Sequence, residues 1–215
     1  DPDWLGEQFV NDAEHLKEVN PDAYENEYMG KANGNGGNVF EYIEDRPITD
    51  EEISHMDRIY QGVDFGWYPD AYAFIRAYYD SAREKIYLID ENYVHKTSNE
   101  VTAQWIKDKG YDDYRIICDS ADPKSISDYR DMGLPAVGAI KGPGSVEYGF
   151  KWLQRRPIVI DKRRPPNAYD EITRYEYDRD KDGNIISGYP DGNDHAISAV
   201  RYAFEALFKR RGNSA

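Results

Sequence analysis

Carboxylate side chains stand at three places in this 215-residue chain where an apolar stretch begins or ends. Asp64 follows Val63 in GVDFG, and Asp119 ends the apolar run of RIICDS. Asp194 and His195 directly precede the apolar stripe of the last helical segment, DGNDHAISAVRYAFE. The ends of secondary-structure elements are where a scaffold presents catalytic side chains.

Carboxylates that converge in one site need a counter-charge. In a low-dielectric site they repel one another by on the order of several kcal/mol unless a cation compensates them. Mg²⁺ and Mn²⁺ suit this role because hard cations prefer oxygen ligands. A neutral imidazole such as that of His195 can bind manganese or orient a water. The pattern therefore predicts divalent-metal chemistry if the three positions meet in the fold.

Two of these acids also have a purely structural explanation. Asp119 could cap the helix that follows it, and Asp194 could be an N-cap that stabilises the helix dipole. Asp64 has no evident basic partner in VDFG, so a structural role is harder to assign to it. The sequence leaves these alternatives open.

Other catalytic chemistries fit the sequence less well. It contains no Walker P-loop and no GxGxxG motif, its four histidines show no zinc spacing, and its one cysteine, Cys118, has no partner pattern for a nucleophile. The Gly-rich segment KGPGS opens a helix and could bind a phosphate at its N-terminus. Its candidate contacts are Lys141, Gly142, Gly144 and Ser145.

The composition narrows the class of protein. A hydrophobic content of 40% supports a real core, whereas the net charge of −14 argues against non-specific coating of DNA. A single cysteine excludes a disulfide framework and favours a reducing compartment. No apolar run reaches the roughly 20 residues that span a membrane. Because the chain begins with Asp1-Pro2 rather than Met, we expect a fragment of a longer protein.

The elements that must position these residues follow from hydrophobic periodicity. Alternating patterns predict three antiparallel strands at 61–66, 71–80 and 85–95, after which helices and short apolar strands alternate. A hairpin is expected to turn at Asp182-Gly183, ahead of the terminal helix. The predicted class is α/β, with a mixed sheet flanked by helices. Residues 1–59 are expected to form a linker or arm from an upstream domain, and residues 60–215 the main domain.

Four segments carry a resemblance to a known family when they are taken in order: GVDFGWYPDAYAF, ICDSADPKSISDYRDMGL, AIKGPGSVEYGFKWLQ and DGNDHAISAVRYAFE. Together they resemble the C-terminal nuclease domain of the terminase large subunit of tailed, headful-packaging phages. The preceding NPDAYENEYMGKANGNGGNVF is similar to the connection between the ATPase and nuclease domains of such proteins.

The resemblance implies a ribonuclease H-like fold and hydrolysis of phosphodiester bonds with two Mg²⁺ or Mn²⁺ ions. It makes Asp64 and Asp119 metal-bridging acids. In a common form of the family an aspartate stands where this chain has Ser198, so the third site falls to Asp194 and His195. Four residues are expected to have supporting roles: Asp70, Asp122, Asp191 and Ser198.

The implied activity is endonucleolytic cutting of concatemeric double-stranded viral DNA during genome packaging, with little sequence specificity. The implied partners are double-stranded DNA, the upstream ATPase domain, the small terminase subunit and the portal, in the host cytoplasm and without a membrane. Two alternatives remain: a non-catalytic docking domain of the packaging motor, or another ribonuclease H-like nuclease such as a junction resolvase or a transposase-like enzyme.

Overall fold

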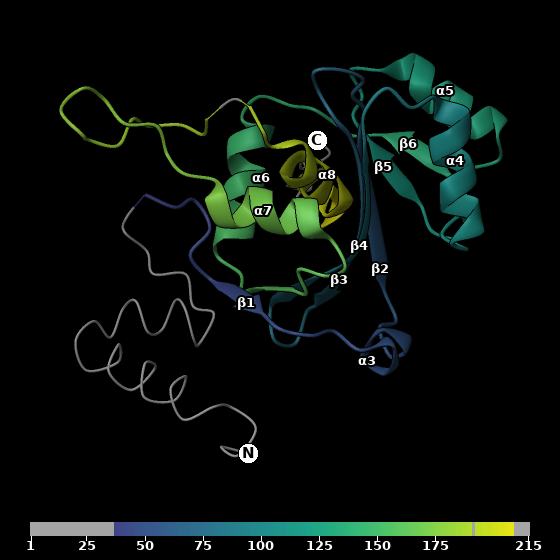
Figure 1. The fold of residues 1–215 in the computed structure, drawn as a ribbon, viewed down its shortest axis with the longest axis horizontal. Helices are drawn as coiled ribbons and strands as arrows, with labels where there is room; N and C mark the ends of the chain where they lie inside the picture. The colour runs from purple at the N-terminus through teal and green to yellow at the C-terminus, as the bar shows by residue number, and fades with distance from the viewer. Residues whose placement is uncertain (1–36, 191, 209–215) are drawn as a thin grey trace, which may run out of the picture.

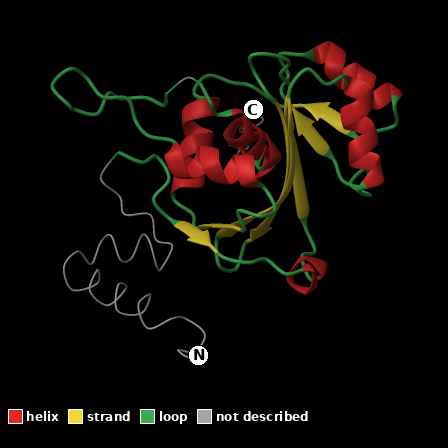
Figure 2. Cartoon of the chain, in the orientation of Figure 1, coloured by secondary structure: helices red, strands yellow, loops and turns green. Residues whose placement is uncertain are grey.

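The computed structural model describes residues 37–190 and 192–208, and a mixed β-sheet organises them (Figures 1 and 2). The strands of the sheet are β1 (Ile43–Asp45), β2 (Ile59–Asp64), β3 (Tyr72–Asp80), β4 (Lys85–Val94), β5 (Ile116–Cys118), β6 (Ala136–Gly138) and β7 (Ile158–Ile160). Their order across the sheet is β1-β7-β4-β3-β2-β5-β6.

The centre of the sheet is an antiparallel meander of β2, β3 and β4. The turn between β3 and β4 is closed by Asp80, whose Oδ1 accepts hydrogen bonds from the backbone N–H groups of Ala82 and Arg83. Side chains that alternate between the two faces of a strand explain why the sequence predicts these three strands well. The predicted antiparallel order is confirmed.

The outer strands are parallel and short. β5 and β6 extend the sheet beyond β2, while β7 and β1 extend it beyond β4. All three residues of β7 are buried, as expected for parallel strands that are covered on both faces. The predicted sequence of antiparallel strands followed by parallel strands is therefore confirmed.

Helices cover both faces of the sheet. They are α3 (Asp50–Ser54), α4 (Asn99–Asp108), α5 (Pro123–Asp131), α6 (Ser145–Gln154), α7 (Pro166–Arg174), α8 (His195–Ala203) and α9 (Glu205–Phe208). Figure 1 shows α4 and α5 on one side of the sheet, and α6, α7 and α8 together on the other. Within the described residues, no helix combines the length and apolarity that crossing a membrane requires.

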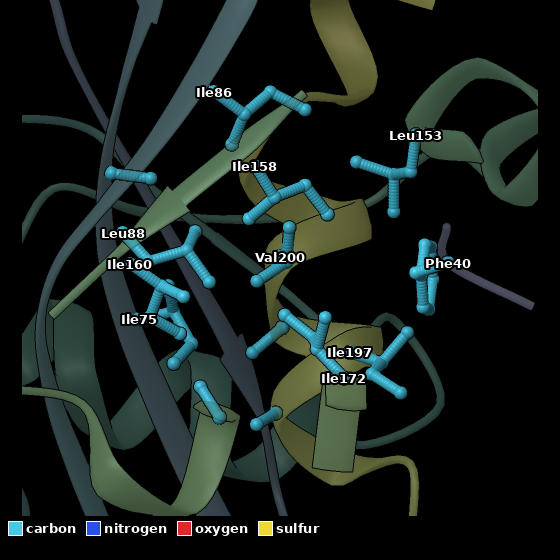
Figure 3. Close-up of a cluster of buried hydrophobic side chains, with 14 of the residues drawn as sticks. Phe40, Ile75, Ile86, Leu88, Leu153, Ile158, Ile160, Ile172, Ile197 and Val200 are labelled. Atoms are coloured by element: carbon cyan, nitrogen blue, oxygen red, sulfur yellow. The ribbon is translucent and has the colours of Figure 1, made fainter. Parts of the chain in front are cut away.

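The larger hydrophobic core lies between the sheet and the group of α6, α7 and α8 (Figure 3). Ile197 and Val200 of α8 are buried in it together with Ile158 and Ile160 of β7. Burial of such side chains is worth about 1.5–3 kcal/mol each, so this face fixes the position of α8 on the sheet. A second core lies under α4 and α5.

Part of the segment that the sequence assigned to the linker belongs to the folded domain. Val39 and Phe40 are each 2% exposed, and β1 pairs in parallel with β7. Lys85 Nζ lies 2.6 Å from Glu44 Oε1, which joins β1 to β4. β1 therefore forms one edge of the sheet, and Val39 and Phe40 pack in the core before it, whereas the expected linker up to residue 36 lies outside the described residues.

The segment between α7 and α8 folds back on itself where the sequence predicts a hairpin. Gly183 has a φ of 86° and a single antiparallel bridge joins Arg179 to Ile185. The hydrogen-bonded ladder does not extend beyond this one bridge among the described residues. The segment projects beyond the helices, away from the main sheet (Figure 1).

Candidate active site

Asp64 and Asp119 lie side by side at one edge of the sheet. Asp64 is the last residue of β2, and Asp119 follows β5, the parallel neighbour of β2. The Asp119 N–H donates to the carbonyl oxygen of Val63 at 2.9 Å. Because parallel strands end at the same edge of a sheet, the two acids are brought together although 54 residues separate them in the sequence.

Helix α8 adds His195 to this edge. Its Nδ1 lies 3.0 Å from Asp64 Oδ2, and its Nε2 lies 3.8 Å from Asp70 Oδ1. The helix packs directly on β2 because Gly62 has no side chain: a Cβ there would lie 1.9 Å from the carbonyl oxygen of Ala199. The close approach of α8 to β2 thus places the His195 imidazole against the Asp64 carboxylate.

The two acids have different electrostatic surroundings. Burial raises the pKa of Asp64; the hydrogen bond from His195 opposes this effect, and the nearby Asp119 charge adds to it. Burial also acts to raise the pKa of Asp119, but the bond from Lys141 and the N–H of Ala121 outweigh it, so this pKa is lowered. The bond to Asp64 raises the pKa of His195.

Lys141 occupies a place that the sequence did not predict. It was expected to contact a DNA phosphate, but its Nζ lies 2.5 Å from Asp119 Oδ1. Each of the two acids therefore has a cationic or protonatable partner from the chain itself. Among the described residues no group of three or more side chains is already arranged to hold a metal ion. The donor set of two carboxylates and an imidazole nonetheless has the chemistry that such an ion prefers, and Lys141 supplies a positive charge at Asp119.

The other predicted residues are placed as follows. Asp194 is the N-cap residue of α8, yet its side chain makes no capping hydrogen bond to the helix. Ser198 is buried one turn further along, and Asp122 accepts bonds from the N–H and hydroxyl of Ser125, which makes it the cap of α5. Asp191 lies outside the described residues.

Gly142 and Gly144 lie in the loop that leads into α6, and Ser145 is the first residue of that helix. Gly144 is the N-cap residue in the left-handed conformation, with a φ of 72°, and no side chain caps the helix. The Ser145 N–H donates to the carbonyl oxygen of Gly142 at 3.0 Å. The geometry is that of an open helix N-terminus beside Lys141.

The sequence interpretation missed Glu171, on α7. Its Oε2 accepts hydrogen bonds from the N–H groups of Ala196 at 2.7 Å and Ile197 at 3.1 Å. Glu171 thus caps α8 from a neighbouring helix, which explains why Asp194 does not. Nothing in the sequence separates Glu171 from other helical glutamates, because its partner is 25 residues away.

Two residues in the second half of α8 were also missed. Arg201 is 8% exposed, and its guanidinium carbon lies 4.8 Å from the centre of the Tyr202 ring. The positive charge of Arg201 acts to lower the pKa of Asp64, so Arg201 influences the edge of the sheet where Asp64 lies. The i, i+3 spacing from Ser198 to Arg201 was the available signal, since both positions lie on one helix face.

Replacement of Glu171 tests its capping role. Burial raises the pKa of Glu171 to about 7 from its usual 4.5. Between these two values the unfolded chain releases its proton before the folded chain does, so Glu171 makes stability fall as pH rises through this window. We expect Glu171→Gln to flatten the decline in melting temperature between pH 4.5 and 7 without metal, and Glu171→Ala to lower stability by roughly 1–2 kcal/mol at low pH.

Glu147→Gln is the matched control, because Glu147 is exposed on α6 and forms a surface ion pair with Lys151. Its pH profile of melting temperature should follow that of the unmodified chain above pH 5. A Glu171→Gln profile parallel to the unmodified one would show that Glu171 does not titrate in this range.

Comparison with known proteins is consistent with this geometry. A family model described as "Terminase RNAseH like domain" matches residues 64–206. The large terminase subunit of Bacillus phage SPP1 is 42% identical over 216 residues, covering 98% of this chain and 51% of that protein. The PBSX phage terminase large subunit of Bacillus subtilis (strain 168) is 30% identical over 206 residues, covering 94% of this chain and 48% of that protein. The chain spans about half the length of these relatives.

Solved structures show the same fold. The nuclease domain of the large terminase g2p from bacteriophage SPP1, solved with bound Mn, is 43% identical; the TM-score is 0.72, and the match covers 78% of this chain and 98% of that one. The P22 large terminase nuclease domain shares the fold at 18% identity, with a TM-score of 0.57 over 79% of this chain and 92% of that one. The predicted ribonuclease H-like fold and the predicted resemblance are confirmed.

Proposed function

The chain belongs to the family of terminase RNase H-like domains, and from this premise we propose that it is a divalent-metal-dependent endonuclease. Its substrate would be concatemeric double-stranded viral DNA, cut during genome packaging with little sequence specificity. The observation that carries this proposal is the convergence of Asp64, Asp119 and His195 at one edge of the sheet, with Asp64 and His195 3.0 Å apart.

Asp64, Asp119 and His195 would hold the metal, with Asp194 beside them at the start of α8. The related SPP1 nuclease domain was solved with bound Mn, which supports a divalent ion at these ligands. We propose two ions, Mg²⁺ or Mn²⁺, which when bound would supply activation of a water and stabilisation of charge on the leaving 3′ oxygen. Lys141 would have to leave Asp119 to release this ligand.

The chain's own residues prepare this site. The hydrogen bond between Asp64 Oδ2 and His195 Nδ1 fixes the orientation of the imidazole. The other ring nitrogen, Nε2, then faces Asp70. A second partner on a ligating histidine commonly fixes its tautomer in this way. Glu171 accepts a hydrogen bond from the first turn of α8 and so helps to keep His195 next to Asp64.

Contacts with DNA would be made to the backbone. Lys141, once released from Asp119, and the open N-terminus of α6 after Gly144 are suited to phosphate oxygens. Such contacts position a duplex and carry no sequence information. We therefore propose cleavage that depends little on sequence.

The wider setting is also a proposal. The two curated relatives are large terminase subunits about twice as long as this chain, which supports an upstream ATPase domain joined through the segment that precedes Val39. The small terminase subunit and the portal would be further partners, and the host cytoplasm the place of action.

A second candidate function is a non-catalytic docking domain of the motor. The ion pair between Lys141 and Asp119 favours it, because a lysine that permanently neutralised a metal ligand would oppose metal binding. The net charge of −14 also disfavours close approach to DNA. The two candidates differ in a measurable activity.

Nicking of supercoiled plasmid separates them. With Mn²⁺ or Mg²⁺ we expect conversion to open-circular and linear forms and then to a smear, and with EDTA no conversion. If two or three phosphate contacts hold the DNA, a fourfold rise in salt should lower apparent affinity by about tenfold to fortyfold. Agarose electrophoresis of time courses measures both effects.

The docking alternative predicts intact supercoiled DNA under every metal condition. Discrete fragments at low enzyme would instead contradict the proposed indifference to sequence. The Asp64→Asn variant, purified in the same way, controls for contaminating nuclease, because a contaminant would remain active in that preparation.

A further inference from the structure

A cavity of about 350 Å³ lies next to the catalytic edge, between the loop that leads into α6 and the end of α8 with α9. The side chains that line it include apolar or aromatic ones and two cationic ones: Ile140, Tyr148, Tyr202, Phe208, Lys141 and Arg201. We refer to this cavity as the loop pocket.

The loop pocket borders the metal ligands without including them. Lys141 forms the boundary: its Nζ is 2.5 Å from Asp119 Oδ1 and 5.9 Å from the centre of the Tyr202 ring. A group bound in the pocket would therefore be separated from Asp119 by the Lys141 side chain alone.

Arg201 gives the pocket a buried positive charge that the fold does not fully satisfy. The residue is 8% exposed, its Nε has no hydrogen-bond partner among the described residues, and its Nη2 reaches Ser198 Oγ only at 3.4 Å. Gly149 makes room for its stem, since a Cβ there would lie 2.7 Å from Arg201 Cγ and Cδ. A buried guanidinium held in this way favours an anionic ligand.

A second source of positive potential faces the same cavity. Gly144 and Ser145 line the pocket at the N-terminus of α6, a ten-residue helix without a side-chain cap. The Ser145 N–H is already bonded to the Gly142 carbonyl oxygen, so the phosphate would be held by the other N–H groups of the first turn of α6. Glu205 is the acid in the lining, and its Oε1 already accepts a bond from the Ile140 N–H at 2.7 Å.

The apolar part of the lining is open to solvent. Ile140 is 61% exposed and Tyr148 is 46% exposed. Exposed aromatic rings beside cations are the arrangement on which single-stranded nucleic acids stack, with base–aromatic stacking worth about 1–3 kcal/mol per base. The pocket thus combines an aromatic surface on which a base could stack with positively charged groups that could bind a phosphate.

We propose that the loop pocket holds one unpaired nucleotide of the substrate strand, with its base against Tyr148 and its phosphate towards Arg201 and the start of α6. This inference rests on the proposed nuclease function and specifies the substrate further: the duplex must be locally opened beside the cut. Since unpairing a mismatched base costs less than unpairing a matched one, the chain should prefer DNA that contains a mismatch.

The test is fluorescence anisotropy of the 215-residue chain in EDTA, so that no cleavage occurs. Two labelled duplexes of equal length are compared, one fully matched and one with a single internal mismatch. We expect the unmodified chain to bind the mismatched duplex at least about fivefold more tightly. Tyr148→Ala should abolish this preference, because it removes the ring against which the unpaired base would stack.

Two variants make the result specific. Tyr148→Phe keeps the ring and should keep the preference. Tyr42→Ala removes another exposed tyrosine, 59% exposed beside the far edge strand, and should also keep it. The proposal is overturned if the unmodified chain binds the two duplexes with equal affinity, or if Tyr148→Ala keeps the preference for the mismatched duplex. In that case the pocket is better explained as a binding site for a protein segment.

Cleavage distinguishes this failure from that of the proposed function. If the unmodified chain fails to nick plasmid with Mn²⁺, the proposed function is wrong whatever the anisotropy shows. If it nicks plasmid normally but does not discriminate between the duplexes, only the nucleotide pocket is refuted.

Discussion

Asp64→Asn and Asp119→Asn will each lower metal-dependent nicking by at least about a thousandfold, on the order of 4 kcal/mol of barrier. Each substitution keeps the shape of the side chain but removes the negative charge that a divalent ion needs. The two residues lie on adjacent strand ends, so neither can replace the other. Initial nicking rates at fixed Mn²⁺ measure the loss.

Stability in EDTA shows whether the fold survives these changes. Burial raises the pKa of Asp64, which means that its charge is unfavourable in the metal-free protein. We therefore expect the melting temperature of Asp64→Asn to equal or exceed that of the unmodified chain. Asp119→Asn loses its charge partner Lys141, but the pair is partly exposed and should contribute at most about 1 kcal/mol.

Asp70→Asn is the matched control for this prediction. The Asp70 side chain is 71% exposed, and its Oδ1 lies 3.8 Å from His195 Nε2. Asp70 is therefore at the margin of the site. Its loss of rate should stay below about tenfold, on the order of 1.4 kcal/mol. A folded Asp64→Asn or Asp119→Asn protein that nicks at the unmodified rate would remove the basis for the assigned metal site.

His195→Ala is expected to reduce nicking by at least about tenfold, about 1.4 kcal/mol of barrier, and Asp194→Ala by a similar factor. Ser198→Ala should have a much smaller effect, because Ser198 is buried and its hydroxyl is oriented towards Arg201. The comparison of these three variants locates the third metal ligand on the first turn of α8 or excludes it from there.

The dependence of metal binding on pH gives a second readout for His195. The bond with Asp64 raises the pKa of His195, so the imidazole stays protonated to a higher pH than usual in the metal-free protein. A protonated imidazole cannot bind a cation. Apparent Mn²⁺ affinity, measured by calorimetry, should therefore fall as pH is lowered through this pKa, and His195→Ala should lack that fall. If Ser198→Ala alone is inactive, the assignment to His195 and Asp194 fails.

The sequence predicts the framework well where the local pattern carries the information. The antiparallel strands β2, β3 and β4 are long, and their side chains alternate, so their existence and order could be read directly. The three-residue strand β1 has no such pattern, and its place beside β7 depends on pairing with residues more than 100 positions away. The sequence therefore predicts a linker where β1 forms.

The candidate site follows the same rule. Asp64, Asp119 and His195 were identified because each stands at an element end, and the structure brings them together. The ion pair of Lys141 with Asp119 and the capping of α8 by Glu171 could not be predicted, because both depend on how separate elements pack. Burial of Arg201 is also a property of packing: its neighbour is the backbone at Gly149, which no periodicity indicates.

The contact between β2 and α8 at Gly62 decides which parts of the site can move. With no side chain between Gly62 and the backbone of Ala199, strand and helix form one stiff frame that carries Asp64 and His195 together. Lys141 and Asp70 come from loops outside this frame. We therefore expect any rearrangement of the site to be carried by these loops, while Asp64 and His195 keep their relative position.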